Sequence, residues 1–66
     1  MIPKFETEAQ RRLFLALSDE WQPARTLAEI AGVPMKGAGT ALLALEARGH
    51  AERRATGRRY EYRRAQ

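Results

Sequence analysis

Residues 35–64 read MKGAGTALLALEARGHAERRATGRRYEYRR, and this stretch decides the fold. Apolar residues recur through its first half at the spacing of a helix with one buried face, at Ala38, Ala41, Leu42 and Leu45. The pattern predicts a helix over about residues 35–48, which Gly49 ends because glycine tolerates left-handed backbone angles. The second half places a Thr-Gly turn signal inside two short runs that each end in paired arginines. It predicts a two-strand β-hairpin over about residues 50–64.

Two more helices are expected upstream of this stretch. Residues 7–10, Thr-Glu-Ala-Gln, match a capping box and predict a helix over about residues 7–18. Pro23 suits the first turn of a helix, so the second is expected over about residues 23–31. Packing against the body is expected of three bulky apolar residues, Ile2, Phe5 and Trp21. Trp21 is expected in the core, at the junction between the first helix and the hairpin.

Length and composition exclude several classes of function. A chain of 66 residues supports one domain with one small core and no deep substrate cleft. There is no cysteine and a single histidine, so no disulfide, metal site or cofactor is expected. Ser18, Asp19 and Glu20 are adjacent and His50 is distant, so we expect no enzyme. No apolar run reaches the ~18 residues that cross a bilayer, and we expect a soluble, cytoplasmic protein with no membrane partner.

Positive charge is concentrated in the final third of the chain. Residues 1–47 hold five Lys or Arg and six Asp or Glu, whereas residues 48–66 hold seven arginines and two glutamates. The planar fork of arginine grips phosphate oxygens two at a time. A solvated surface charged for solubility is the plainer interpretation of a charge run. The concentration of this positive charge on a hairpin beside a helix favours an anionic partner instead.

Two stretches carry a family resemblance. Residues 26–34, TLAEIAGVP, precede a helix with the pattern A-x-x-A-L-x-x-L-E-x-R-G, and residues 49–63 read GHAERRATGRRYEYR. Together they resemble bacterial winged helix-turn-helix repressors of the ArsR and MarR types, over about residues 24–64. The resemblance implies an α+β, mostly α fold for the single domain 1–66, with three helices and a C-terminal two-strand hairpin as the wing.

The chain also departs from that family pattern. ArsR-type sensors bind metal through clusters of Cys, His or carboxylates on their helices, and no comparable cluster is present here. They also dimerise through terminal helices, whereas the sequence here ends at the hairpin. We therefore carry over the DNA-reading unit of the family and neither its metal site nor its dimer.

The register of the hairpin is predicted from its turn. If Thr56 and Gly57 form the two-residue loop, the facing pairs are Ala55 with Arg58, Arg53 with Tyr60, and Ala51 with Tyr62. Alternation then places Ala51, Tyr60 and Tyr62 on one face and both tyrosines inward. The same register sets Glu52 opposite Glu61, which is a local electrostatic cost.

The resemblance implies that the helix over 35–48 enters the major groove of duplex DNA while the wing reaches the flanking backbone or minor groove. On the exposed face of that helix, only Lys36 and Thr40 can hydrogen-bond to base edges. Gly37 and Gly39 indicate either a close approach by a partner or an irregular helix start. The candidate DNA-binding residues are Lys36, Gly37, Gly39, Thr40, Arg54, Arg58, Arg59 and Arg63.

Two functions from different classes follow. The first is a small protein that binds double-stranded DNA, such as a transcriptional regulator or a phage or plasmid accessory factor. The second is a protein-interaction module, or a homodimer, that uses the outer face of the helix at Gly37, Gly39, Leu43 and Ala47. RNA remains open as a partner because arginines grip either backbone, although inward-facing tyrosines leave no stacking surface.

Overall fold

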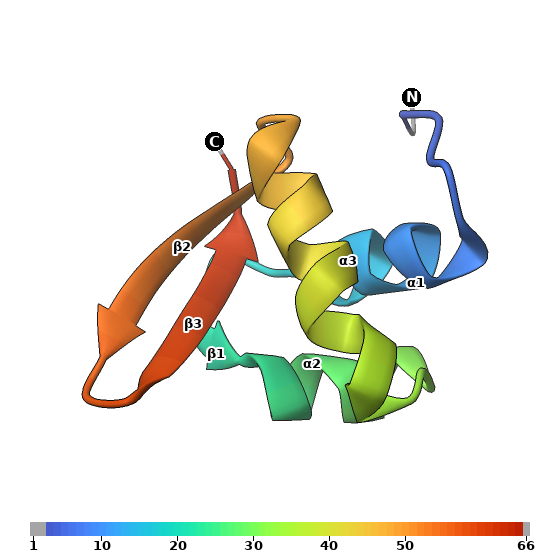
Figure 1. Ribbon diagram of the computed structural model, residues 1–66. Coiled ribbons are helices and arrows are strands. Elements are labelled where there is room, and N and C mark those ends of the chain that lie inside the picture. The colour runs from blue at the N-terminus through green and yellow to red at the C-terminus, as the bar shows by residue number, and fades with distance from the viewer. Residues whose placement is uncertain (1–2, 66) are drawn as a thin grey trace.

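The computed structural model describes residues 3–65 and shows an α+β, mostly helical fold (Figure 1). Its elements are α1 (Glu8–Ala16), β1 (Gln22–Pro23), α2 (Ala24–Ala31), α3 (Met35–Ala47), β2 (Ala51–Thr56) and β3 (Arg59–Arg64). The helices lie within two residues of the expected bounds. None of the helices in this part of the chain is long and apolar enough to cross a membrane.

The sheet has three antiparallel strands within the described residues, so the expectation of a two-strand hairpin alone was wrong. The additional strand, β1, pairs Gln22 with Tyr62 and Pro23 with Glu61, which makes β3 the central strand. A strand of two residues is too short to show the alternation that predicts strands. Pro23, which cannot donate to a ladder, is tolerated because β1 is an edge strand.

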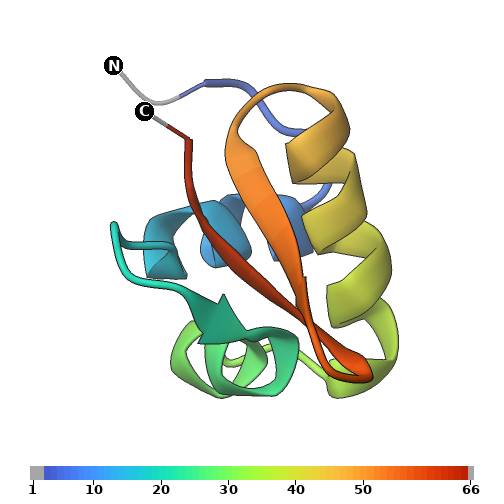
Figure 2. The ribbon, with the colours of Figure 1, turned by 90° about the vertical axis from the view of Figure 1, so that its left-hand side faces the viewer.

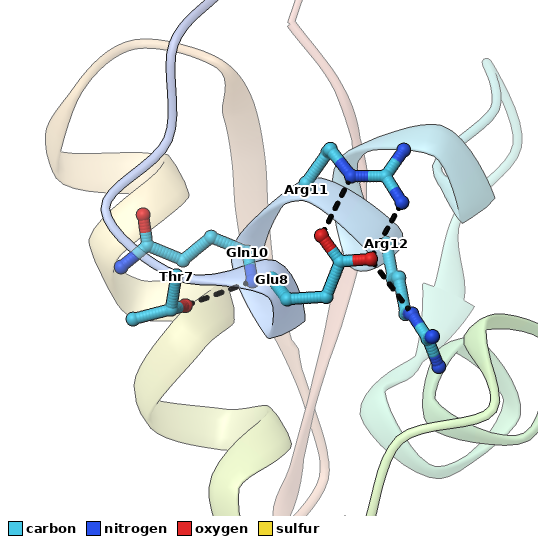
Figure 3. A network of polar contacts seen from close by, with 5 residues as sticks. All are labelled: Thr7, Glu8, Gln10, Arg11 and Arg12. Atoms are coloured by element: carbon cyan, nitrogen blue, oxygen red, sulfur yellow. Dashed lines mark hydrogen bonds and ion pairs between the residues drawn. The ribbon is translucent and has the colours of Figure 1, made fainter.

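The start of α1 shows one of the two hydrogen bonds that a capping box would have (Figure 3). The Thr7 hydroxyl accepts a hydrogen bond from the Gln10 backbone N–H at 3.1 Å, which satisfies one free donor of the first turn. In a capping box the Gln10 side chain would accept from the N–H of the cap itself. Here its Oε1 accepts from the Glu6 N–H at 3.4 Å, one residue earlier, and Gln10 is buried.

The core lies where the three helices meet the inner face of the sheet (Figure 1). Its members are Leu13, Leu17, Leu27, Ala28, Ala38, Ala41, Leu42, Leu45, Ala51 and Tyr62. The four residues predicted for the buried face of α3 are all among them. Gly49 ends that helix with a φ of +80°, as expected. Phe5 packs on Phe14 with ring centroids 5.2 Å apart, whereas Ile2 lies outside the described residues.

Trp21 is not a core residue, which corrects the expectation from sequence. Its side chain is only partly buried. The guanidinium groups of Arg54 and Arg63 lie 4.7 and 4.5 Å from the ring centroid. Trp21 directly precedes β1, and Arg54 and Arg63 project from the sheet face opposite to buried Tyr62. The ring therefore packs on the outer face of the sheet.

The observed register of the hairpin differs from the predicted one by two residues. Thr56 pairs with Arg59, so the loop consists of Gly57 and Arg58 and not of Thr56 and Gly57. Gly57 has a φ of +63°, the left-handed value that the first position of a tight hairpin turn requires. The shift keeps every side chain on its predicted face, because the strand period is two.

Ion pairing gives the physical reason for the shifted register. The predicted register set Glu52 opposite Glu61, whereas the observed one sets Glu52 opposite Arg63 and Arg54 opposite Glu61. Both facing pairs form salt bridges, at 2.6 Å for Arg63 with Glu52 and 2.8 Å for Arg54 with Glu61. The predicted register would also set Arg54 opposite Arg59, so two like-charge oppositions are replaced by two attractive cross-strand pairs.

Candidate functional site

The outer surface of α3 carries the residues expected to read bases. Lys36, Gly37 and Thr40 are exposed, and Gly39 lies partly buried on the side that faces the hairpin. Both glycines lie inside the helix, and a Cβ built on either would meet nothing within 4 Å. No contact within the described chain therefore requires glycine at these positions, and they leave the helix surface smooth.

The tip of the hairpin carries two exposed arginines, Arg58 and Arg59. Neither forms an ion pair within residues 3–65. The tip projects away from the helices (Figure 1), and in the view of Figure 2 it lies on the same side of the molecule as α3. The hairpin tip and α3 thus lie on the same side of the molecule.

The other two candidate arginines of the hairpin lie in a different environment. Arg54 and Arg63 are on the outer face of the sheet, each paired with a glutamate of the neighbouring strand and each packed on Trp21. The structure therefore does not bring all the predicted DNA-binding residues together. It divides the four candidate DNA-binding arginines of the hairpin into a tip pair, Arg58 and Arg59, and a sheet pair, Arg54 and Arg63.

The remaining arginines of the basic C-terminal third are also engaged within the chain. Arg48 pairs with Glu6, and Arg53 pairs with Glu46 at 3.2 Å. Arg64 donates through Nη2 to the Phe14 carbonyl at 2.7 Å and lies over the Phe14 ring. Of the seven arginines in residues 48–64, five thus have an acidic, carbonyl or aromatic partner in the described structure. The tip pair keeps its charge available.

A groove of about 500 Å³ runs between α3 and the inner face of the hairpin. Its lining residues are Pro23, Ala24, Arg25, Met35, Gly39, Leu43, Arg53, Arg59, Tyr60 and Tyr62. Arg25, in the first turn of α2, was missed from the sequence. It is exposed and forms no ion pair with the residues described here. One feature of the sequence could have drawn attention to Arg25. It lies in the first turn of α2, which has no acidic residue, although a helix N-terminus favours acidic residues over cations.

The two tyrosines of β3 have different environments. Tyr62 is buried, with 2 % of its surface exposed, and this burial raises the pKa of its hydroxyl above the usual value. Tyr60 is 50 % exposed and lines the groove, so the expectation that both tyrosines point into the core was wrong. Tyr60 pairs with Ala55 near the tip, where the hairpin extends beyond the helices that cover Tyr62 (Figure 1).

Comparison with known proteins identified no relative: no family model, curated protein or solved structure matched this chain. Within residues 3–65, no three His, Cys, Asp or Glu side chains gather as a metal site would require. The candidate site is therefore defined by geometry and charge alone. It comprises the outer surface of α3, the tip pair, and the groove between them.

Proposed function

We propose that this protein is a small winged helix-turn-helix protein that binds double-stranded DNA in the cytoplasm of a bacterium. It would act as a transcriptional regulator or as a phage or plasmid accessory factor. The observation that carries the proposal is that the hairpin tip, where Arg58 and Arg59 form no ion pair within residues 3–65, lies on the same side of the molecule as α3. The turn between α2 and α3 and the three-strand sheet are compatible with this fold.

In the proposed complex, α3 lies in the major groove, whose width admits a helix. Lys36 and Thr40 supply the hydrogen-bonding groups for base edges, and the smooth surface at Gly37 lets the helix backbone approach the DNA closely. Arg58 and Arg59 contact phosphates beside the groove. Such contacts position the protein without reading sequence.

The structure changes which cations we assign to phosphate contact. Arg54 and Arg63 have internal partners, and we assign them to the stability of the sheet. Arg25 lacks an ion pair among the described residues and lines the same groove as Arg59, so it joins the phosphate-contacting set. Arg25, Arg58 and Arg59 contact phosphates, and Lys36 neutralises phosphate charge from within the major groove while it contacts a base edge. About four neutralised phosphates give a slope of roughly −3.6 for log affinity against log salt.

Fluorescence anisotropy with a labelled random duplex at several salt concentrations tests this function. We expect binding at low salt that weakens steeply as salt is added, with a slope between roughly −3 and −4. The absence of binding to any duplex at low salt would rule the proposal out. Selection of bound sequences from a random pool then identifies the preferred site. Thr40→Ala is expected to weaken binding to that site and to leave binding to random DNA unchanged.

A protein-interaction function is the second candidate, and one observation favours it. Leu43 is 45 % exposed on α3, between the small residues Gly39 and Ala47, which is an apolar surface that could form a homodimer seam. Sedimentation of the protein and of Leu43→Gln separates the two functions. Self-association that disappears in the variant while DNA affinity persists would support the second candidate. A monomeric wild type would count against the homodimer.

A further inference from the structure

Tyr60 differs from the other aromatic residues in its exposure. The chain has two phenylalanines, two tyrosines and one tryptophan, all within the described residues, and of these Tyr60 is the exposed one, with 50 % of its surface accessible. Aromatic side chains are more frequent at binding surfaces than on the rest of a protein surface. The sequence offered no stacking surface while both tyrosines were expected in the core, and the exposed Tyr60 ring supplies one.

Contacts within the protein hold this ring in place. The guanidinium of Arg53 lies over the Tyr60 ring, 4.5 Å from its centroid, and Arg53 is itself paired with Glu46 of α3 at 3.2 Å. One face of the ring is therefore covered, and the exposed surface of Tyr60 belongs to its opposite face and its edges. A side chain that is already fixed loses little conformational entropy when a flat group stacks on it.

The groove beside the ring combines apolar surface with positive charge. Met35 and Leu43 of α3 line it and are 50 and 45 % exposed. Arg25 and Arg59 also line it, and neither forms an ion pair within residues 3–65. None of the described residues that line the groove is acidic. Its volume of about 500 Å³ falls within the range of small-molecule sites, so a flat ring with anionic groups beside it fits both its size and its charge.

We infer that this groove binds an unpaired base of a single-stranded nucleic acid. The base stacks on the open face of the Tyr60 ring, beside Met35 and Leu43. The phosphates on either side of the base contact Arg25 and Arg59. Within a duplex the faces of each base are covered by its stacked neighbours, so a paired base cannot take this position. The inference goes beyond the duplex function proposed above and does not require it.

Trp21 provides an internal comparison, because it too packs against arginines of the hairpin. The guanidinium groups of Arg54 and Arg63 lie 4.7 and 4.5 Å from its ring centroid, and each is paired with a glutamate. Trp21 thus has two cations packed on it whose charge is already neutralised. The groove has an exposed ring and two arginines without ion pairs in the described structure. We therefore expect bases to stack on Tyr60 and not on Trp21.

Single strands of equal charge test the inference by fluorescence anisotropy at low salt. The probes are an oligothymidylate, an oligouridylate as the RNA form, and a chain of the same length in which every base is replaced by an abasic sugar. We expect a strand with bases to bind about tenfold or more tightly than the abasic chain, because stacking acts only where a base is present. Whichever of the two binds more tightly identifies DNA or RNA as the source of the base. If neither binds more tightly than the abasic chain, the arginines hold the backbone alone and the inference is overturned.

Substitutions of the two rings locate the stacking site. Tyr60→Leu should reduce this preference for bases to about twofold or less, whereas Tyr60→Phe should keep it, because phenylalanine retains the ring without the hydroxyl. Trp21→Leu makes the same kind of replacement on the outer face of the sheet and should keep the full preference. Retained dispersion of the amide spectrum establishes that each variant is folded. A full preference in Tyr60→Leu would contradict the assignment.

Photochemical crosslinking applies the same test to the unaltered protein. On irradiation, a 5-iodouracil placed in the tighter-binding strand forms a covalent bond with an aromatic side chain that stacks on it, and mass spectrometry identifies the residue. We expect the crosslink at Tyr60. A crosslink at Trp21, or none at any aromatic residue, would overturn the inference.

Duplex titrations separate this inference from the proposed function. Single strand and duplex should compete, because both contact Arg25 and Arg59. If the single strands show the preference for bases and no duplex binds, the stacking site stands and the duplex function fails. If duplex binds and the single strands show no preference for bases, the stacking site fails and the duplex function stands.

Discussion

The tip and the body of the hairpin both carry arginines, but those of the body have partners within the protein and those of the tip are exposed. In the body, Arg54 and Arg63 are held by glutamates across the strands and by the ring of Trp21. At the tip, Arg58 and Arg59 are exposed and form no ion pair within residues 3–65. The number of arginines therefore overstates the charge that a partner can reach. An arginine is available to a partner only where no neighbouring carboxylate or aromatic ring of the protein already binds it.

The largest expected effect comes from removing the tip charges. The double variant Arg58→Gln/Arg59→Gln should bind duplex DNA roughly tenfold or more weakly, alike for all sequences, with a salt slope smaller by about two. The matched double variant Arg54→Gln/Arg63→Gln removes the same formal charge. It should change affinity less than about threefold, because those groups are already paired. Equal losses in the two variants would remove the distinction between tip and body.

The second effect concerns the body. Trp21→Ala removes the ring against which two guanidinium groups pack, and should lower the free energy of unfolding by about 2 kcal/mol. Tyr60→Ala is the matched control, because one guanidinium, that of Arg53, lies over that half-exposed ring, and about 1 kcal/mol is expected. Urea denaturation measures both. A Trp21→Ala protein as stable as wild type would show that the outer face of the sheet adds no stability.

The third effect concerns the turn that presents the tip pair. Gly57 has a φ of +63°, and a Cβ there would meet nothing within 4 Å, so Gly57→Ala should cost about 1 kcal/mol from backbone strain alone. Gly37→Ala has equally open surroundings but lies inside a helix. It should therefore stabilise the protein by up to about 1 kcal/mol. Thermal unfolding that gave the two substitutions the same sign would contradict the observed turn.

The smallest effect tests a third set of internally paired arginines, on α1. Arg11 and Arg12 donate hydrogen bonds to Glu8 and lower the pKa of its carboxyl from 4.5 to about 2 (Figure 3). Because the folded pKa lies below the unfolded one, this pairing stabilises the protein above about pH 4.5. The stabilisation is lost as the pH falls toward 2.

NMR titration of the Glu8 carboxyl carbon should show a midpoint near pH 2. Glu8→Gln should lower the thermal midpoint slightly at neutral pH and leave it unchanged at the acid end of this window. A small effect is expected because all three side chains are exposed. A Glu8 midpoint near 4.5 would show that the pairing seen in the structure does not persist in solution.

Sequence patterns predicted the parts of this fold that follow the helical period. Leu42 and Leu45 were placed in the core because amphipathic helices have a period that sequence reveals. Strand β1 was missed because Gln22 and Pro23 become a strand only by pairing with β3. Trp21 was misplaced because its partners are arginines that the fold brings to it.

The candidate site was less predictable than the fold. The Thr-Gly signal located the turn to within one residue, but the ion pairs between β2 and β3 decided the register and therefore which arginines are neutralised. Arg25 was missed because its place in the groove results from packing of α2 beside the hairpin. The sequence thus predicted a basic hairpin, and only the three-dimensional structure showed which of its arginines have partners within the protein and which are exposed.

A duplex titration followed by NMR tests the central claim most directly, because it observes tip, body and helix in one experiment. With the ¹⁵N-labelled chain, the account predicts shifts at the amides of Lys36 and Thr40 and at the side-chain Nε–H groups of Arg58 and Arg59. The indole N–H of Trp21 should stay in place. Large shifts at Trp21, with the α3 and tip signals unmoved, would contradict it.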